Sequence, residues 1–224
     1  MFKLWPWLEA NKNRLLGSVA AVVVAVGLYY FVSWRHDQNE INAGEALTQM
    51  LVASPSLTPE QSAEALGKLA ADHAGTAAAQ RAQLSAAAGW FNVGRYADAQ
   101  TQFQKALDAN ATGPLAATAA LGIASSLEAL GKLEDAAAAY RKVASQFPDS
   151  AAAAPAKFAL GRMAEQQGKF AEAMNLYQEL SRNNFAGSLA SEASLRALEL
   201  KAKIPAAPKP VVAPVVAPAA PKAK

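Results

Sequence analysis

The sequence predicts an all-α protein in which a single N-terminal transmembrane helix is followed by a solenoid of helical hairpins and a disordered Pro/Ala-rich tail. Three observations predict this fold class: an uncharged apolar stretch near the start, a repeat with a period of 37 residues through the middle, and a proline-rich end. They divide the chain into four segments, residues 1–14, 15–34, 35–203 and 204–224.

Charge is distributed unevenly along these segments. The net charge is +2 before residue 35, −2 from residue 35 to residue 204, and +3 in the remaining residues. Binding of nucleic acid requires Lys and Arg clustered on a folded face, and the middle segment has no such excess, so we expect no nucleic-acid partner. The chain contains no cysteine, which excludes disulfides, thiol catalysis and thiolate metal sites.

The predicted membrane span, residues 15–34, reads LLGSVAAVVVAVGLYYFVSW and carries no charge. At about 1.5 Å rise per residue, a helix of this length crosses a hydrocarbon core of about 30 Å. Aromatic residues gather near both ends, as interfacial belts do; they are Trp5, Trp7, Tyr29, Tyr30, Phe31 and Trp34. A cleaved signal peptide is the alternative, but its apolar run is shorter and ends in a small-x-small site, whereas this run ends in VSW.

The flanking charges predict the orientation of the span. Lys3, Lys12 and Arg14 precede it, while only Arg35 follows it closely. Because positive charges near a span stay on the cytoplasmic side, residues 1–14 are expected to be cytoplasmic. The chain after Trp34 is then expected to be periplasmic or otherwise outside the cytoplasm.

The repeat is visible at several positions at once, each spaced by 37 residues. The recurring residues are the glycines Gly94, Gly131 and Gly168, the following Tyr96, Leu133 and Phe170, then Ala99, Ala136 and Ala173, and then Phe103, Tyr140 and Tyr177. Upstream of them recur Leu84, Leu121, Phe158 and Leu195, and also Ala82, Ala119, Ala156 and Ala193. Such agreement at independent positions predicts one structural unit per period.

Each unit is predicted to contain two amphipathic helices, because apolar residues recur at i, i+3 and i+4 and the glycine falls where the first helix must stop. The alanines allow close approach of helices, and the ring four residues later fills the gap between successive pairs. A degenerate earlier unit begins at Lys68, with a partner helix expected at 40–52. Thr58 and Pro59 predict an N-cap and first helical position. A last helix at 186–203 should close the stack.

This pattern resembles the tetratricopeptide repeat family over residues 40–203. The resemblance depends on the small residue at the eighth position of each unit, Ala87, Ala124 and Gly161, and on the alanine at the twentieth. The family's usual period is 34, so three residues must be absorbed between units. The proline expected after the second helix is clear only as Pro148.

The resemblance implies a protein-binding groove lined by the first helix of each hairpin. Carried over by position, the groove residues are Arg81, Leu84, Ala88, Phe91, Thr118, Leu121, Ser125, Glu128, Pro155, Phe158, Arg162 and Glu165. Within this set Leu84, Leu121 and Phe158 align with Leu195 in a row that suits an apolar peptide or helix. The same row is also consistent with ordinary packing between neighbouring helices.

Nothing in the sequence indicates catalysis. His36 and His73 are the only histidines, and neither lies in a metal-ligand pattern. The chain has no GxxxxGK[ST], GxGxxG or HExxH motif. Adjacent acids such as Glu134 and Asp135 follow the turn glycine, where carboxylates favour a helix N-terminus. We therefore expect no enzyme activity, no cofactor and no metal.

The arrangement of an N-terminal anchor before degenerate repeats also resembles the YfgM-like proteins, ancillary subunits of the bacterial SecYEG translocon. This resemblance implies a single-pass protein of the bacterial inner membrane whose periplasmic domain contacts the translocon and a membrane-bound chaperone or prolyl isomerase. Two other functions remain open: an adaptor coordinating cell-envelope assembly or division, and a self-assembling structural protein. The tail, with six Pro among its last twenty residues, suits a solvated end, a spacer or a peptide ligand.

Overall fold

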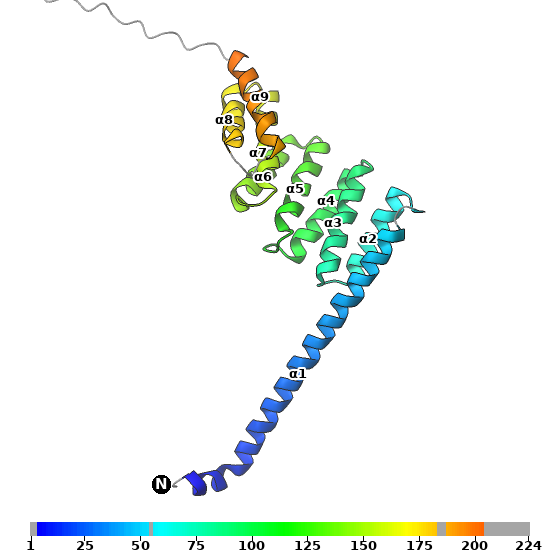
Figure 1. Ribbon diagram of the computed structural model, residues 1–224, viewed down its shortest axis with the longest axis vertical. Coiled ribbons are helices and arrows are strands. Elements are labelled where there is room, and N and C mark those ends of the chain that lie inside the picture. The colour runs from blue at the N-terminus through cyan, green and yellow to red at the C-terminus, as the bar shows by residue number, and fades with distance from the viewer. Residues whose placement is uncertain (1–3, 54–55, 183–186, 204–224) are drawn as a thin grey trace, which may run out of the picture. The chain divides into compact units, whose positions relative to one another are not determined.

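The computed structural model describes the backbone at residues 4–53, 56–182 and 187–203, with side chains at the same residues apart from 4–11 and 15. All regular elements in these ranges are α-helices, as predicted (Figure 1). They are α1 (Leu4–Ala53), α2 (Pro59–Asp72), α3 (Ala77–Asn92), α4 (Tyr96–Ala109), α5 (Ala116–Ala129), α6 (Leu133–Gln146), α7 (Ala153–Gln166), α8 (Phe170–Ser181) and α9 (Ser188–Lys203). The chain divides into two compact units, residues 1–157 and 158–224.

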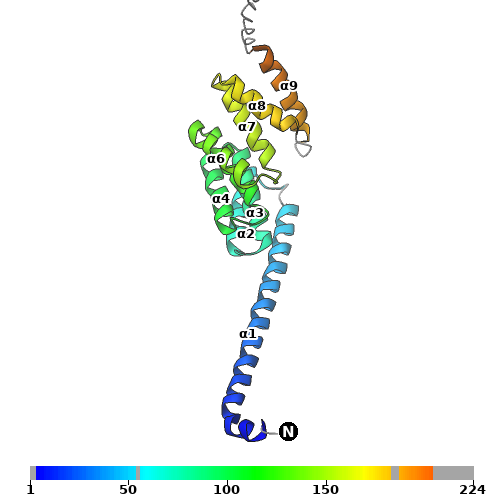
Figure 2. The same cartoon turned by 90° about the vertical axis from the view of Figure 1, so that its left-hand side faces the viewer.

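Helix α1 contains the predicted span and continues without a break to Ala53. The separate helix expected at 40–52 is therefore the C-terminal part of α1. Over the apolar stretch the described side chains are exposed, and α1 meets the other helices only near its C-terminal end (Figures 1 and 2). By length and composition, α1 is the one described helix that could cross a membrane.

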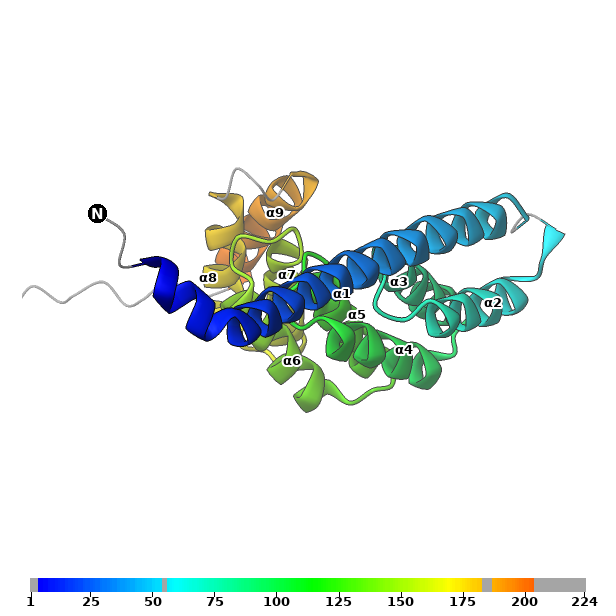
Figure 3. The same ribbon diagram turned by 90° about the horizontal axis from the view of Figure 1, so that it is seen from below.

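The C-terminal part of α1 packs beside α2 and α3 (Figure 3). Leu47 and Met50 of α1 contact a buried cluster formed by Leu66, Ala70, Ala79, Ala82 and Ala86. Helix α2 begins as predicted, with Thr58 as N-cap and Pro59 in the first turn. The Thr58 hydroxyl accepts from the Gln61 amide at 3.2 Å while the Gln61 side chain accepts from the Thr58 amide at 3.0 Å, which completes a capping box.

The three recurring glycines end the first helix of each hairpin in the left-handed conformation. Their φ angles are 81° at Gly94, 74° at Gly131 and 73° at Gly168, which confirms the prediction. The second helix of each hairpin begins two residues after the glycine. It has acidic residues in its first turn, where the helix dipole favours them.

The buried alanines confirm the 37-residue register. The four aligned alanines of the first helices, Ala82, Ala119, Ala156 and Ala193, have no exposed surface. The three aligned alanines of the second helices, Ala99, Ala136 and Ala173, have none either. The rings of Phe103, Tyr140 and Tyr177 are also buried. Phe103 lies in a cluster with Ala87 and Trp90 of α3, with Ile123 of α5 packed against it. A large ring therefore does fill the space between successive hairpins.

The three extra residues of the period lie between hairpins. Six residues, 110–115, separate α4 from α5, whereas three residues, 93–95, separate α3 from α4. The segment turns twice, with the Gly113 amide donating to the Asn110 carbonyl and the Ala116 amide to the Gly113 carbonyl. The same pair of turns follows α6: the Ser150 amide donates to the Phe147 carbonyl, and the Ala153 amide donates to the Ser150 carbonyl. The longer period thus lengthens only the connection between successive hairpins.

The C-terminal end of the described chain is helix α9, which packs on α8. Its bounds, Ser188–Lys203, agree with the last helix predicted at 186–203. The predicted tail, 204–224, lies outside the described residues.

Candidate functional site

Helix α3 supplies four of the predicted groove residues, Arg81, Leu84, Ala88 and Phe91. Arg81 is exposed, whereas Leu84 and Phe91 are half-buried. Both apolar side chains pack against the buried cluster around Trp90 and Phe103, and the Phe91 ring meets Tyr96 edge-on at 5.1 Å between centroids. Leu84 and Phe91 therefore pack against the core with part of their surface and keep the rest exposed.

Helix α5 supplies the next groove residues and lies beside α3. Leu121 and Glu128 are half-buried, and Thr118 is exposed. The Tyr140 hydroxyl donates to a Glu128 carboxylate oxygen at 2.8 Å and lies 3.2 Å from the Ser125 hydroxyl. Glu128 is thus held by a buried tyrosine of the same hairpin.

The second unit carries the predicted residues Phe158, Arg162 and Glu165, all half-buried. The Phe158 ring packs against Tyr177 at 5.4 Å between centroids. Glu165 lies 3.6 Å from the guanidinium of Arg196 and 3.9 Å from the ammonium of Lys203 on α9. Its charge therefore helps to hold the last helix of this unit in place.

The hydroxyl of Tyr177 donates to the Glu165 carboxylate at 3.4 Å. Burial of the phenol raises the pKa of Tyr177 to about 12, and the negative charge of Glu165 adds to this effect while Arg196 opposes it. The neutral phenol is the form that fits this site.

We expect the second unit to lose stability as pH rises from about 10 to about 12. The pKa of Tyr177 is raised from 10.0 to about 12, so its stabilising contribution is complete below pH 10 and disappears as the folded protein titrates. A shift of this size corresponds to a contribution on the order of 2 kcal/mol. Circular dichroism melts across this pH range check it. Tyr177→Phe keeps the ring, so its melting temperature should depend less on pH; an equal dependence would contradict the assignment.

A tyrosine–glutamate pair recurs along the repeat, and sequence reasoning missed it. Tyr140 pairs with Glu128 and Tyr177 with Glu165, each over twelve residues. At the aligned positions of the preceding hairpin the ring is Phe103, which has no hydroxyl, and the carboxylate is replaced by Phe91. The sequence did contain a signal for this pair: where the repeat has tyrosine it also has glutamate twelve residues earlier, and where the tyrosine becomes Phe103 the glutamate becomes Phe91. Glu128 and Glu165 therefore contribute to the packing of their own hairpins as well as to the predicted groove.

The residues of the predicted apolar row differ in solvent exposure. Leu84, Leu121 and Phe158 are half-buried, whereas Leu195 is 63% exposed. Leu198, three residues later on α9, is 62% exposed, so these two side chains share an open face of the last helix. Leu84 and Phe91 of α3 and Leu121 of α5 thus lie in the first compact unit, and Phe158 and Leu195 lie in the second.

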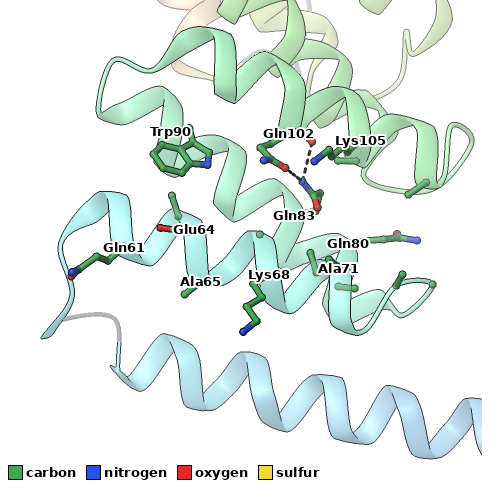
Figure 4. A pocket seen from close by; sticks show the side chains of 18 residues that line it. Gln61, Glu64, Ala65, Lys68, Ala71, Gln80, Gln83, Trp90, Gln102 and Lys105 are labelled. Atoms are coloured by element: carbon green, nitrogen blue, oxygen red, sulfur yellow. Dashed lines mark hydrogen bonds between the residues drawn. The ribbon is translucent and has the colours of Figure 1, made fainter.

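A hollow of about 960 Å³ lies between α2, α3 and α4 and was not foreseen from the sequence (Figure 4). Its lining includes small residues such as Ala63, Gly67 and Ala106. The Gln83 amide group donates to the side-chain and backbone oxygens of Gln102. Small side chains on the facing helices leave this space open, and the two glutamines supply amide groups at its wall.

Side chains that commonly bind metal ions do not form a cluster within the described ranges. No three His, Cys, Asp or Glu side chains there form a possible metal site. His36 lies 4.0 Å from Glu40, and Glu40 in turn accepts from the backbone amide of Ala77. Glu40 thus helps to cap the N-terminus of α3.

Comparison with known proteins finds a family match for part of the repeat region. Residues 90–151 match the sequence model of the tetratricopeptide repeat. No curated protein matches the chain. The structure is similar to a tetratricopeptide repeat protein from Parabacteroides merdae, with 14% identity, a TM-score of 0.57, and coverage of 72% of this chain and 60% of that one.

Two further solved structures are similar. TPR-like repeats from Podosopora anserina give 13% identity and a TM-score of 0.53, covering 72% of this chain and 92% of that one. The Yersinia enterocolitica type III secretion chaperone SycD, in complex with a peptide of the translocator YopD, gives 23% identity and a TM-score of 0.46, covering 54% and 91%. The family model thus matches residues 90–151, and the first two of these solved structures show that the hairpins have the fold of tetratricopeptide repeats.

Proposed function

We propose that this protein is a membrane-anchored scaffold or chaperone-like adaptor that binds other proteins on the periplasmic side of a bacterial inner membrane. The observation that carries the proposal is α1, whose apolar stretch leads directly into the repeat domain. Tetratricopeptide repeats build surfaces for protein partners, and the sequence offers no catalytic motif. Anchoring and partner binding together describe an adaptor.

The surface of α3 and α5 is the proposed partner-binding site in the first unit. Leu84, Phe91 and Leu121 leave apolar surface open, and Arg81 adds an exposed positive charge nearby on α3. Such a combination suits an amphipathic helix or an apolar peptide segment that carries acidic residues. Phe158, Arg162 and Glu165 are the corresponding proposed residues of the second unit. The architecture favours the SecYEG translocon and a membrane-bound periplasmic chaperone or prolyl isomerase as partners.

Photo-crosslinking from the proposed surface tests this function. Ala88 on α3 and Thr118 on α5 are exposed positions of the predicted groove, and Ala97 on α4 is an exposed control. A crosslinker at Ala88 or Thr118 is expected to capture a translocon component or a newly made envelope protein, whereas one at Ala97 captures neither. If the groove positions give no more product than Ala97, the adaptor proposal fails.

Orientation is checked in the same cells. Protease added to spheroplasts is expected to digest the repeat domain and to leave an N-terminal tag intact, because residues 1–14 are proposed to be cytoplasmic. A tag that is digested while the domain survives would reverse the topology.

An adaptor in cell-envelope assembly or division is the alternative, and the proline-rich tail favours it. Six of the last twenty residues are proline, a composition that partners recognise in the polyproline II conformation. Under this alternative, deletion of residues 205–224 abolishes partner capture in a pull-down from solubilised membranes. Under the translocon proposal the deletion has little effect on capture.

A further inference from the structure

We infer that the membrane span and the first repeats form one rigid unit, which holds the surface of α3 and α5 at a fixed height above the bilayer, where it binds the juxtamembrane segment of an integral membrane protein. This inference rests on the proposed membrane anchoring and adds to it the place of binding and the class of partner. Three features of α1 carry it.

The first feature is the continuity of α1 between the span and the repeats. The stretch RHDQNEINA, residues 35–43, contains neither Gly nor Pro and is helical throughout. Sharp kinks in helices occur almost always at such residues or at local irregularities of the hydrogen-bond ladder. The domain is therefore joined to the span by a stiff helix and not by a flexible linker.

The second feature is the packing of α1 against the repeats. Ala43 has no exposed surface, and Leu47 and Met50 contact the buried cluster between α2 and α3. These three side chains occupy one face of the helix, since they are spaced by four and three residues. The C-terminal part of α1 is thus built into the core and cannot turn independently of it.

The third feature is a contact that fixes the level of α3 along α1. The backbone amide of Ala77, at the first position of α3, donates to both carboxylate oxygens of Glu40, at 2.9 and 3.1 Å. A carboxylate at a helix N-terminus is favoured by the helix dipole and by the charge on the acceptor. The N-terminus of α3 therefore lies level with Glu40.

Helix geometry then gives the height of the binding surface. Glu40 follows Trp34, the last residue of the span, by six residues, which corresponds to about 9 Å. Leu84 lies seven residues beyond Ala77 on α3, which adds about 10 Å if α3 runs roughly along the direction of α1. The apolar surface around Leu84 is thus about 20 Å from the end of the span.

This height determines which partners can reach the surface. With the span in a bilayer, the turn that contains Ala74 would face the bilayer, because the N-terminus of α3 lies level with Glu40 and α3 then leads from Ala77 to Asn92 away from it. A chain held about 20 Å from the hydrocarbon core is next to the extramembrane loops of membrane proteins and to segments leaving the membrane. Leu84, Phe91 and Leu121 offer apolar surface to such a segment. A juxtamembrane segment meets this surface without needing to extend far from the bilayer.

Site-specific fluorescence in lipid vesicles tests the placement, and the absence of native cysteine makes single labels simple. Full-length Ala74→Cys and Asn92→Cys, both at exposed positions, are labelled and reconstituted with lipids that carry a headgroup quencher. Quenching is expected to be several-fold stronger at Ala74 than at Asn92. Equal quenching of the two positions would overturn the inference.

An uncoupled variant provides the matched control. A Gly/Ser linker inserted between Asp37 and Gln38 preserves the span and the Glu40 contact but breaks the stiff connection. It should remove the difference between the two labels and lower, several-fold, crosslinking from Ala88 to membrane-embedded proteins. Unchanged crosslinking would show that the height of the surface does not select the partner.

Flotation with the vesicles separates the two possible failures. A chain that floats but shows equal quenching is anchored without being held rigidly, so the inference is wrong and the anchoring proposal stands. A chain that does not float contradicts both.

Discussion

Replacement of Ala136 by leucine is expected to lower the melting temperature of the repeat domain much more than the same replacement at Ala138. Ala136 has no exposed surface, whereas Ala138 on the same helix is exposed. Overpacking of a buried site typically costs about 1–3 kcal/mol, because neighbouring helices must move apart. At Ala138 the added side chain extends into solvent and costs little.

The effect should spread beyond one hairpin. The stability of a solenoid is approximately a sum of repeat and interface contributions, so a displaced α6 also weakens the contact with α5. Circular dichroism melts of the two full-length variants in detergent measure the difference. Equal shifts would show that the register of α6 is misplaced, and with it the proposed groove, since both follow from the same 37-residue alignment.

Gly122→Ala and Gly67→Ala are expected to change stability in opposite directions. A β-carbon at Gly122 would overlap the ring of Phe103, which is only 7% exposed and lies in the core cluster of α3 and α4. Because the ring is enclosed, it cannot move aside without opening that cluster. The substitution should destabilise the first unit by about 1–3 kcal/mol, as overpacking does.

At Gly67 the nearest atom to an added β-carbon is the Ala86 side chain at 3.9 Å, an ordinary contact distance. Alanine favours a helix interior over glycine by up to about 1 kcal/mol, so this variant should be more stable than the parent chain. Denaturant unfolding of the two variants gives the comparison. A stabilising effect of Gly122→Ala would mean that Phe103 does not occupy the space above Gly122.

Each of these comparisons uses two positions that hold the same amino acid and differ only in the residues packed around them. Ala136 and Ala138 are the same residue two positions apart, and Gly67 and Gly122 are both glycines within helices. The repeat alignment singled out Ala136, but nothing in the sequence distinguished the two glycines. Their difference arises because Phe103 packs onto α5, which follows it by thirteen or more residues.

The sequence by itself determined the local units: the hairpins, their left-handed turn glycines, the Thr58 cap and the buried alanines of the repeat. These features depend on backbone preferences and on periodicity, which act over a few neighbouring residues. The tertiary structure decided which side chains meet across helices. It joined the predicted span to the first repeat helix, placed the Glu40 carboxylate on the amide of Ala77, and engaged Glu128 and Glu165 with buried tyrosines. Such contacts depend on how whole helices pack against one another, and a local pattern contains no information on that packing.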